Sequence, residues 1–521
     1  MGGGFAALFI IASASDFLTT SLGEAYHRIQ PLTTIFRAVL IAILLLWLVA
    51  WISFALCESL PTRWKRMAWL VPLTCLPWLV CRDLSAVFIF PRLASAGFAA
   101  MPWVPPIALV VFLTLFLLRP RLFDWCMVCG RSAYIVAAFA LLLILPKVVF
   151  HSISRAPAAS SFERSGVSAA PPSASRIVWI LMDEFSYDQA FDHRQPDVAL
   201  PNFEAFARSS VLFSAVDPIG SWTELVLPAL LLGKPVVDFR KPYAKLPSYR
   251  THTGGPWTQF DQYDTIFGDA HRLAWSTGIA GWYNPYCRLL PDVLDRCFWQ
   301  YSEDSRTPYS RFLDSGNTTM RNLAVIFSFP SFLYRAFNIP LPNYTEVHRQ
   351  DYAALMTQSK DLLHDARIRF VFLHMPVPHP PGIYDRARKT MSDTGNFLDN
   401  LVLADVTLGA LLADIQSTPA ARNTTVIVSS DHSWRTFIWK DLPGWSPEEQ
   451  HVSNGKFDPR PILIVHLPDS HDGQTISVPT SAMFVHDMLE AMLRSEIHSD
   501  ADIDALRAKQ PSSFGGAAGA Q

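Results

Sequence analysis

Charged residues are scarce in this sequence. Only 17% of its 521 residues are charged, 50% are hydrophobic, and the formal net charge is −2. Nucleic-acid binding needs clustered lysine and arginine side chains that replace phosphate counterions, and no such cluster occurs, so we expect no nucleic-acid partner. So apolar a composition in a chain of this length indicates a membrane portion beside a soluble portion.

Long apolar runs are rare after Phe150, whereas charged, histidine and turn-forming residues are spread evenly after Arg176. The sequence therefore predicts a transmembrane region at 1–150 and a soluble region at 176–508. The segment 151–175 between them is rich in Ser, Ala and Pro and predicts a flexible linker. The residues 509–521 predict a disordered tail.

About five helices are expected in the transmembrane region. The run from Ile35 to Leu56 is long enough to cross a hydrocarbon core of about 30 Å, and its single charge, Arg37, lies near one end. Two comparable runs and two runs interrupted by charges complete the set: Phe98–Leu118, Ser132–Phe150, Met67–Phe90 and Phe5–Leu22. The two interrupted runs could be tilted, re-entrant or interfacial. The run nearest the N-terminus, Phe5–Leu22, could instead be an uncleaved signal-like stretch.

Basic residues in two short loops orient these helices. The loops contain Arg63, Lys65 and Arg66, and Arg119, Arg121 and Arg131. Loops rich in lysine and arginine stay in the cytoplasm, so both loops are predicted to be cytoplasmic. The last helix then carries the chain out of the cytoplasm, and the soluble region is predicted to be extracytoplasmic.

The seven cysteines agree with this topology. Cys126 and Cys129 fall in a predicted cytoplasmic loop, where a reduced pair is expected because no second pair completes a zinc site. The outer region contains only Cys287 and Cys297. In an oxidising compartment these two are predicted to form a local disulfide.

In the soluble region, short β-prone runs alternate with helical patterns, which predicts an α/β fold with a largely parallel central sheet. Three of the runs end at residues that bind metals. Ile177–Met182 is followed by Asp183 and Glu184, Phe370–Leu373 by His374, and Val426–Val428 by a Ser-Ser pair and then Asp431 and His432.

Sites in open α/β sheets lie beyond the carboxyl ends of the strands, so these three endings are expected to meet in one crevice. Carboxylates with a histidine suit a divalent cation such as Mn, Zn, Mg or Ca. Taken singly, an acid after a strand often caps the next helix, and a lone histidine is usually only hydrogen-bonded. Taken together, the three endings favour a metal site, because a buried carboxylate is costly unless it is paired or coordinated.

Five blocks between Arg176 and Pro468 resemble the sulfatase-like, alkaline-phosphatase superfamily in order and spacing. They are RIVWILMDEFSYD, LPNFEAFARSSVLFSAV with TELVLPALLLGK, VFLHMPVPHPPGIYD, NFLDNLVLADVTLGALLADI with its internal Asp405, and VIVSSDHSW. The membrane architecture is similar to that of lipoteichoic acid synthases and of the phosphoethanolamine transferases that modify lipid A. The resemblance implies an alkaline-phosphatase-like catalytic domain in a bacterial inner, multi-pass membrane protein.

In those relatives a threonine five residues before a proline is the nucleophile, and here that position is Thr223 before Pro228. The sequence that matures a Cys or Ser into formylglycine in many sulfatases does not occur at this position. A second departure is Ser433, which stands where many hydrolases of the superfamily have glycine.

The resemblance implies that one divalent cation is held by Asp183, Thr223, Asp431 and His432, with Glu184 as a reserve ligand, and a second cation is left open. It also implies that His374 and His379 lie near substrate oxygens, where they could protonate a leaving alcohol or hydrogen-bond the anion. Arg435, His451 and Lys456 lie downstream, where relatives often place substrate or second-metal groups, but they could equally be ordinary surface residues.

The leading hypothesis is a transferase that moves a phospho-linked head group from a membrane phospholipid to an envelope glycan or lipid through a phosphothreonine. The first alternative is a sulfatase-like hydrolase or phosphodiesterase that passes the group to water. The second alternative is an inactive membrane scaffold. The sequence leaves the donor, the acceptor and the oligomeric state open.

The two basic loops generate a prediction about orientation. An alkaline-phosphatase reporter fused near Ser175 should be active because that residue is expected outside the cytoplasm, and one fused near Trp125 should be inactive. Reporter activity in whole cells, corrected for expression, measures both. The reverse pattern would contradict the predicted topology.

Overall fold

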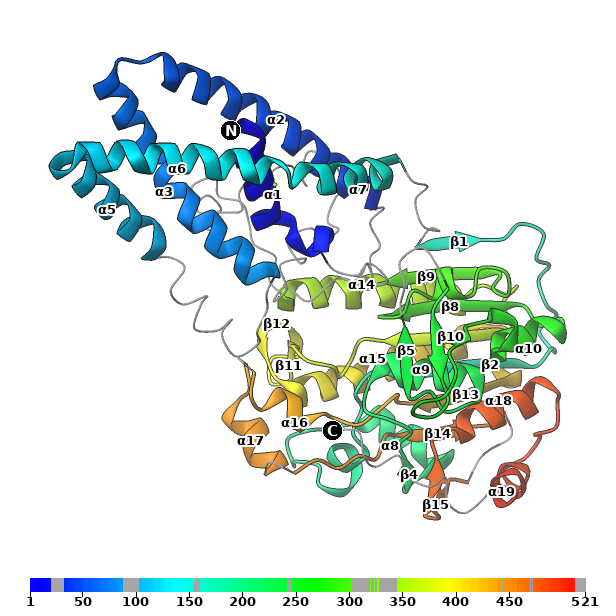
Figure 1. The fold of residues 1–521 in the computed structure, drawn as a ribbon. Coiled ribbons are helices and arrows are strands. Elements are labelled where there is room, and N and C mark those ends of the chain that lie inside the picture. The colour runs from blue at the N-terminus through cyan, green and yellow to red at the C-terminus, as the bar shows by residue number, and fades with distance from the viewer. Residues whose placement is uncertain are drawn as a thin grey trace. The chain divides into compact units, whose positions relative to one another are not determined.

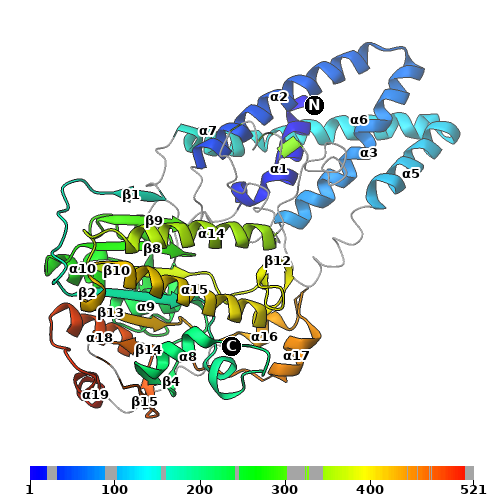
Figure 2. The same cartoon turned by 180° about the vertical axis from the view of Figure 1, so that it is seen from behind.

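The computed structural model describes residues 1–19, 32–87, 103–153, 160–240, 246–301, 344–442, 444–454, 456–468, 470 and 472–510, and four single positions between 319 and 327. Parts of the predicted spans at 20–22, 88–90 and 98–102, and the tail beyond residue 510, lie outside the described residues. The chain divides into two compact units, a helical unit before residue 158 that also includes the four single positions, and an α/β unit (Figures 1 and 2).

The described helices of the first unit overlap the predicted apolar runs. They are α1 (Gly2–Thr19), α2 (Leu32–Ser59), α3 (Thr62–Val87), α5 (Val104–Leu118), α6 (Pro120–Ala138) and α7 (Leu141–Ile153). However, α6 begins well before the last predicted run, which is divided between α6 and α7. By length and apolar composition, two helical stretches of the described residues could cross a membrane, Ile35–Ser59 and Pro120–Phe150. α5 is apolar but shorter.

The prediction of a loop between Arg119 and Arg131 is wrong, because α6 begins at Pro120 and runs through this segment. Proline suits the first position of a helix, where its missing N–H group is not needed and its φ is already helical. The chain therefore turns at Arg119 alone, between α5 and α6. The cysteines 126 and 129 lie on a helix rather than in a loop.

Two ion pairs join the basic segments that orient the helices. Glu58 at the end of α2 contacts Arg131 at 2.6 Å, and Arg66 in α3 contacts Asp124 in α6 at 2.6 Å. Both pairs are partly exposed, so each contributes little to stability. They nevertheless hold the two basic segments close together.

The α/β unit is built on a nine-stranded sheet in the order β1-β9-β8-β10-β2-β13-β14-β3-β15. The strands are β1 (Ser161–Glu163), β9 (Arg296–Gln300), β8 (Thr277–Trp282), β10 (Phe370–Met375), β2 (Arg176–Met182), β13 (Thr424–Ser429), β14 (Leu463–His466), β3 (Val211–Phe213) and β15 (Gln474–Ile476). From β9 to β13 all neighbours are parallel, whereas β1 and β14 pair antiparallel. The α/β class with a largely parallel sheet centre is confirmed.

Side-chain alternation along β2 builds a core on each face of the sheet. Ile177, Trp179 and Leu181 pack into one core, and the residues between them pack into the other. The first core is covered by α9 (Thr223–Leu232), α10 (Ile266–Arg272) and α18 (Phe484–Leu493). The second is covered by α8 (Pro201–Arg208), α14 (Tyr344–Leu363) and α15 (Phe397–Ser417), which Figure 2 shows in front of the sheet.

Shorter elements surround this sheet. The remaining helices are α11 (Tyr286–Leu289), α16 (Thr436–Trp439), α17 (Pro447–Ser453) and α19 (Asp500–Ala508), and the remaining strands are β4 (Val216–Asp217), β5 (Asp238–Arg240), β6 (Ser248–Arg250), β7 (Thr258–Gln259), β11 (Gly382–Asp385), β12 (Thr390–Gly395) and β16 (Thr480–Ser481). Part of the predicted flexible linker is ordered. Its residues Ser161–Glu163 form β1 at the edge of the sheet, because Phe162 packs against the first core.

The three strands that were expected to carry metal-binding residues are neighbours, in the order β10-β2-β13. They run parallel, with Phe370 opposite Ile177 and Thr424 opposite Arg176. Their carboxyl ends therefore lie at one edge of the sheet, and the predicted convergence of the three endings is confirmed.

Cys287 in α11 and Cys297 in β9 form a disulfide with a sequence separation of 10. Closing a loop of this size lowers the entropy of the unfolded chain, so Cys287→Ala with Cys297→Ala should reduce the free energy of unfolding by about 2–3 kcal/mol. Chemical denaturation of the full chain measures the change. Cys129→Ala, which removes a free exposed thiol, is the control, and equal stability of both variants would contradict the prediction.

Candidate active site

Two fully buried carboxylates lie at the carboxyl edge of the sheet. Asp183 follows β2, and its backbone N–H donates to the Met375 carbonyl at 3.1 Å. Asp431 follows β13, and its Oδ1 accepts the backbone N–H groups of Glu184 at 3.1 Å and His432 at 2.9 Å. Asp183 Oδ1 has no hydrogen-bond partner within the described part of the chain, although it is buried. Such an atom is costly to bury without a cation or a donor beside it.

The Thr223 hydroxyl lies beside Asp431 and His432, and the region formed by Asp183, Thr223, Asp431 and His432 is called the corner below. Thr223 is the first residue of α9 and is buried, with 6% of its surface exposed. Its Oγ1 donates to Asp431 Oδ2 at 2.7 Å and lies 3.1 Å from His432 Nε2. The structure therefore brings together the predicted nucleophile and two of its predicted metal ligands.

The tautomer of His432 makes this corner rich in lone pairs. Its Nδ1 donates to the Ser433 carbonyl at 3.0 Å, so Nε2 carries a lone pair that faces Thr223. Asp431 Oδ2 lies 3.2 Å from His432 Nε2, and it is the atom to which the Thr223 hydroxyl donates. One ligand atom from each of Asp183, Asp431 and His432 lies within 4.8 Å of the others. Two carboxylates, an imidazole and a hydroxyl in this arrangement fit a divalent cation.

Burial and charge shift the ionisation of these groups. Burial, followed by the charge of Asp431, raises the pKa of Asp183. Burial and then the nearby Arg435 lower the pKa of His432 to about 3, so its ring is neutral at pH 7 and its lone pair is available. A bound cation favours the ionised carboxylates and offsets the cost of burying them together.

Glu184 is held by Arg435 rather than open as a ligand. Its Oε1 accepts the Arg435 backbone N–H at 2.7 Å and the Trp439 indole N–H at 2.7 Å, and the Arg435 guanidinium contacts both oxygens at 3.1 Å. Burial disfavours a charged guanidinium, but the charge and hydrogen bonding of Glu184, together with the charges of Asp183 and Asp431, outweigh it and raise the pKa of Arg435. Asp183, Glu184 and His379 also offer three ligand atoms within 4.8 Å, but an ion there competes with Arg435 for Glu184.

His374 and His379 have different surroundings. His374 is fully buried, with Nε2 3.2 Å from Asp183 Oδ2 and Nδ1 2.8 Å from the Tyr286 hydroxyl, and burial lowers its pKa to about 4. Both of its nitrogens are therefore engaged by buried side chains, one of them by Asp183. His379 accepts an N–H from Arg435 at 3.2 Å, and burial followed by the charge of Arg435 lowers its pKa.

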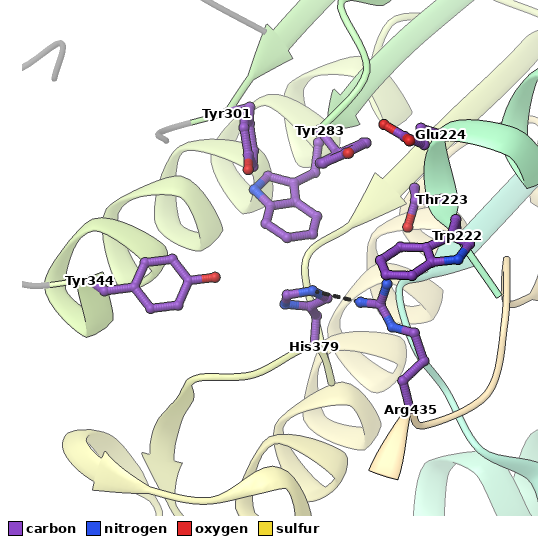
Figure 3. A pocket seen from close by; sticks show the side chains of 9 residues that line it. Trp222, Thr223, Glu224, Tyr283, Tyr301, Tyr344, His379 and Arg435 are labelled. Atoms are coloured by element: carbon purple, nitrogen blue, oxygen red, sulfur yellow. Dashed lines mark hydrogen bonds between the residues drawn. The ribbon is translucent and has the colours of Figure 1, made fainter. Parts of the chain in front are cut away.

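A small recess is lined in part by Thr223. It is lined by Trp222, Thr223, Glu224, Trp282, Tyr283, Tyr301, Tyr344, His379 and Arg435. Figure 3 shows the Tyr344 hydroxyl directed toward His379 from one side, and Trp222 and Arg435 beside Thr223 on the other. The sequence analysis missed its aromatic rings, and the available signal was the Gly-Trp-Tyr-Asn stretch at the carboxyl end of β8.

Three further predicted residues take other places. Asp405 in α15 accepts the Phe203 backbone N–H and the Asn202 amide, each at 2.8 Å, so it fixes the first turn of α8. His451 and Lys456 are exposed, and neither lines the recess formed by the described residues.

Removing the Arg435 side chain should leave the buried carboxylate of Glu184 without its positively charged partner. Arg435→Ala is expected to cost about 3–5 kcal/mol of unfolding free energy, because an uncompensated buried charge remains. Adding Glu184→Gln to that variant should recover part of the loss, since no charge is then left behind. Denaturation of both single variants and the double variant measures the coupling, and strictly additive effects would contradict the pairing.

No protein-family model matches the chain, and no curated protein matches it. Similar solved structures include a sulfatase from Pseudoalteromonas sp., with 16% identity, coverage of 65% of this chain and 69% of that chain, and a TM-score of 0.41. The phosphonate monoester hydrolase of Agrobacterium radiobacter has 14% identity, coverage of 62% and 74%, and a TM-score of 0.37. A murine ectonucleotide pyrophosphatase/phosphodiesterase in complex with AMP has 11% identity, coverage of 64% and 100%, and a TM-score of 0.37. These neighbours belong to the alkaline-phosphatase superfamily.

Proposed function

We propose that this protein is a membrane-anchored enzyme of the alkaline-phosphatase superfamily that transfers a phospho-linked head group from a membrane lipid to an envelope acceptor. The observation that carries the proposal is the Thr223 hydroxyl, which lies 2.7 Å from Asp431 and 3.1 Å from His432 at the mouth of a recess. An ordinary buried threonine needs one acceptor, whereas this one faces two and a neighbouring unpartnered carboxylate oxygen of Asp183.

The surroundings of Thr223 suit a nucleophile. A free threonine hydroxyl is a weak nucleophile and needs an adjacent base or a cation. Asp431 accepts its hydrogen bond, and the N-terminal end of α9 favours the negative charge that develops on the oxygen during attack. A divalent cation held by Asp183, Thr223, Asp431 and His432 would lower the pKa of the hydroxyl and neutralise charge on the phosphoryl oxygens.

The transfer has two halves. In the first, Thr223 Oγ1 forms a bond to phosphorus, the ester bond to the lipid breaks, the hydroxyl proton passes to Asp431, and the departing alkoxide takes a proton from solvent. In the second, an acceptor hydroxyl attacks phosphorus and gives its proton to solvent, the Oγ1–P bond breaks, and Thr223 Oγ1 recovers its proton from Asp431. Arg435 stays charged beside the recess and can bind the anionic group in both halves.

Membrane anchoring and an extracytoplasmic site are part of the same proposal. The support is the two long apolar helices of the first unit and the ion pairs that hold its basic segments together. The disulfide in the α/β unit also suits an oxidising compartment, and the five other cysteines are free.

Substitutions of the proposed nucleophile and of a proposed metal ligand should have different effects on metal content and turnover. Thr223→Ala should abolish turnover but keep much of the bound metal, because Asp183, Asp431 and His432 remain. Asp431→Ala should lose both metal and activity, because a divalent ion is then poorly neutralised. Elemental analysis of the purified full-length variants measures the metal. Thr223→Ser, which keeps a hydroxyl, is the conservative control, and wild-type turnover by Thr223→Ala would refute the mechanism.

The same preparation tests the acceptor. After exposure to phospholipid, mass spectrometry of wild-type protein should find a phospho-linked adduct on Thr223, and adding an envelope glycan or lipid should discharge it to a modified acceptor. Release of the group to water at the same rate with and without acceptor would establish a hydrolase. A protein that binds no divalent cation and forms no adduct would be an inactive scaffold.

A further inference from the structure

A buried chain of three side chains ends at one of the proposed metal ligands. The Tyr286 hydroxyl lies 2.8 Å from His374 Nδ1, and His374 Nε2 lies 3.2 Å from Asp183 Oδ2. All three residues have no exposed surface. We propose that Tyr286 is a positioning residue, which orients Asp183 through His374 and is itself held in place by the Cys287–Cys297 disulfide.

The chain fixes one tautomer of His374. A neutral imidazole has one N–H and one lone pair. If Nε2 carried the lone pair, it would face the carboxylate oxygen of Asp183, which also carries lone pairs. The favourable arrangement has Nε2–H donating to Asp183 and the Tyr286 hydroxyl donating to Nδ1. Without that hydroxyl, the buried Nδ1 loses a hydrogen-bond donor, and the ring loses one of the contacts that orient it, the Trp282 backbone being another.

The consequence for Asp183 follows from its two oxygens. Oδ2 is engaged by His374, whereas Oδ1 has no hydrogen-bond partner among the described residues, and one ligand atom of Asp183 lies within 4.8 Å of ligand atoms of Asp431 and His432. Holding one oxygen therefore aims the other at the proposed cation. Removing a residue that forms a hydrogen bond with a metal ligand commonly lowers the metal affinity by about 10–100-fold.

The sequence around Tyr286 keeps its ring in place. The ring packs edge-on against Phe372 with centroids 5.6 Å apart. A Cβ added to Gly281 in β8 would lie 2.4 Å from the Tyr286 ring, so the absence of a side chain there is what lets the ring lie against the strand. The next residue, Cys287, is covalently bound to Cys297 in β9, which ties α11 to the sheet.

This inference rests on the metal site of the proposed function, and binding of the metal alone tests it. The probe is whichever of Mn²⁺, Zn²⁺, Mg²⁺ and Ca²⁺ binds the wild-type full-length protein most tightly by calorimetry. Tyr286→Phe should weaken that affinity by about three- to tenfold, at or below the low end of the range for such partners, because its hydroxyl acts through an intervening ring. The thermal midpoint of each variant reports whether it folds.

The matched control is Tyr352→Phe. Tyr352 in α14 also donates or accepts a hydroxyl hydrogen bond, to Thr407 at 2.9 Å, and it contacts none of the proposed ligands. This variant loses a comparable hydrogen bond and should keep wild-type metal affinity. A Tyr286→Phe variant that binds metal as tightly as Tyr352→Phe overturns the inference.

The role of the disulfide is tested with a double-mutant cycle. Chemical reduction is not suitable, because reducing agents themselves bind metals. Cys287→Ala with Cys297→Ala should weaken metal binding in the wild-type background and much less in the Tyr286→Phe background, because both act on the same contact. Equal losses in the two backgrounds would separate the disulfide from Tyr286 and overturn that part of the inference.

Two further variants keep the result readable if Tyr286→Phe does not fold. His374→Gln retains a donor for Asp183 and an acceptor for Tyr286, so it should bind metal more tightly than His374→Ala, and equal affinities would overturn the inference. Wild-type protein that binds no divalent cation overturns the proposed function together with this inference. Wild-type binding that Asp431→Ala abolishes and Tyr286→Phe leaves unchanged overturns this inference alone.

Discussion

The buried pair of carboxylates, Asp183 and Asp431, is the constraint on which the site depends. Neither is in an ion pair with a lysine or arginine of the described residues, and each is fully buried. Burial of a carboxylate is costly unless hydrogen bonds or a cation compensate. Backbone N–H groups and the Thr223 hydroxyl compensate Asp431, whereas Asp183 Oδ1 has no hydrogen-bond partner among the described residues. A cation bound beside Asp183 would compensate this oxygen, which is the physical basis for the proposed metal site.

Backbone conformation directly after the strands satisfies this constraint. Glu184 has a φ of 68°, in the left-handed region that non-glycine residues rarely adopt. That turn lets its backbone N–H donate to Asp431 while its carboxylate meets Arg435. Tyr283, just after β8, has a φ of 64° and lines the recess. Residues with a positive φ therefore occur both beside the proposed metal ligands, at Glu184, and in the recess, at Tyr283. The surrounding packed structure stabilises these conformations.

The strand endings could be predicted from the sequence because their signal is local. A β-prone run followed by Asp183, or by Asp431 and His432, specifies both the strand and its terminus, and parallel pairing then brings distant segments to one edge. The partners of those residues could not be predicted in the same way. Arg435 could not be distinguished from a surface arginine until its contact with Glu184 was known. The alternation of side chains along the strand predicts that His374 is buried. It gives no information on which side chain forms a hydrogen bond with its ring, and the contact with Tyr286 came only from the structure.

The buried charges also bear on the kind of ester that the proposed site would accept. Asp183, Asp431 and Glu184 contribute three negative charges when ionised, and Arg435 contributes one positive charge. One divalent cation would bring this set to neutrality. A phosphodiester would then add a single negative charge, which the N-terminal end of α9 favours. A phosphomonoester dianion adds twice as much charge to a corner of low dielectric constant and calls for a second cation, whose carboxylate ligand Glu184 is already bound by Arg435. A single cation therefore suits a phosphodiester such as a phospholipid head group better than a phosphomonoester.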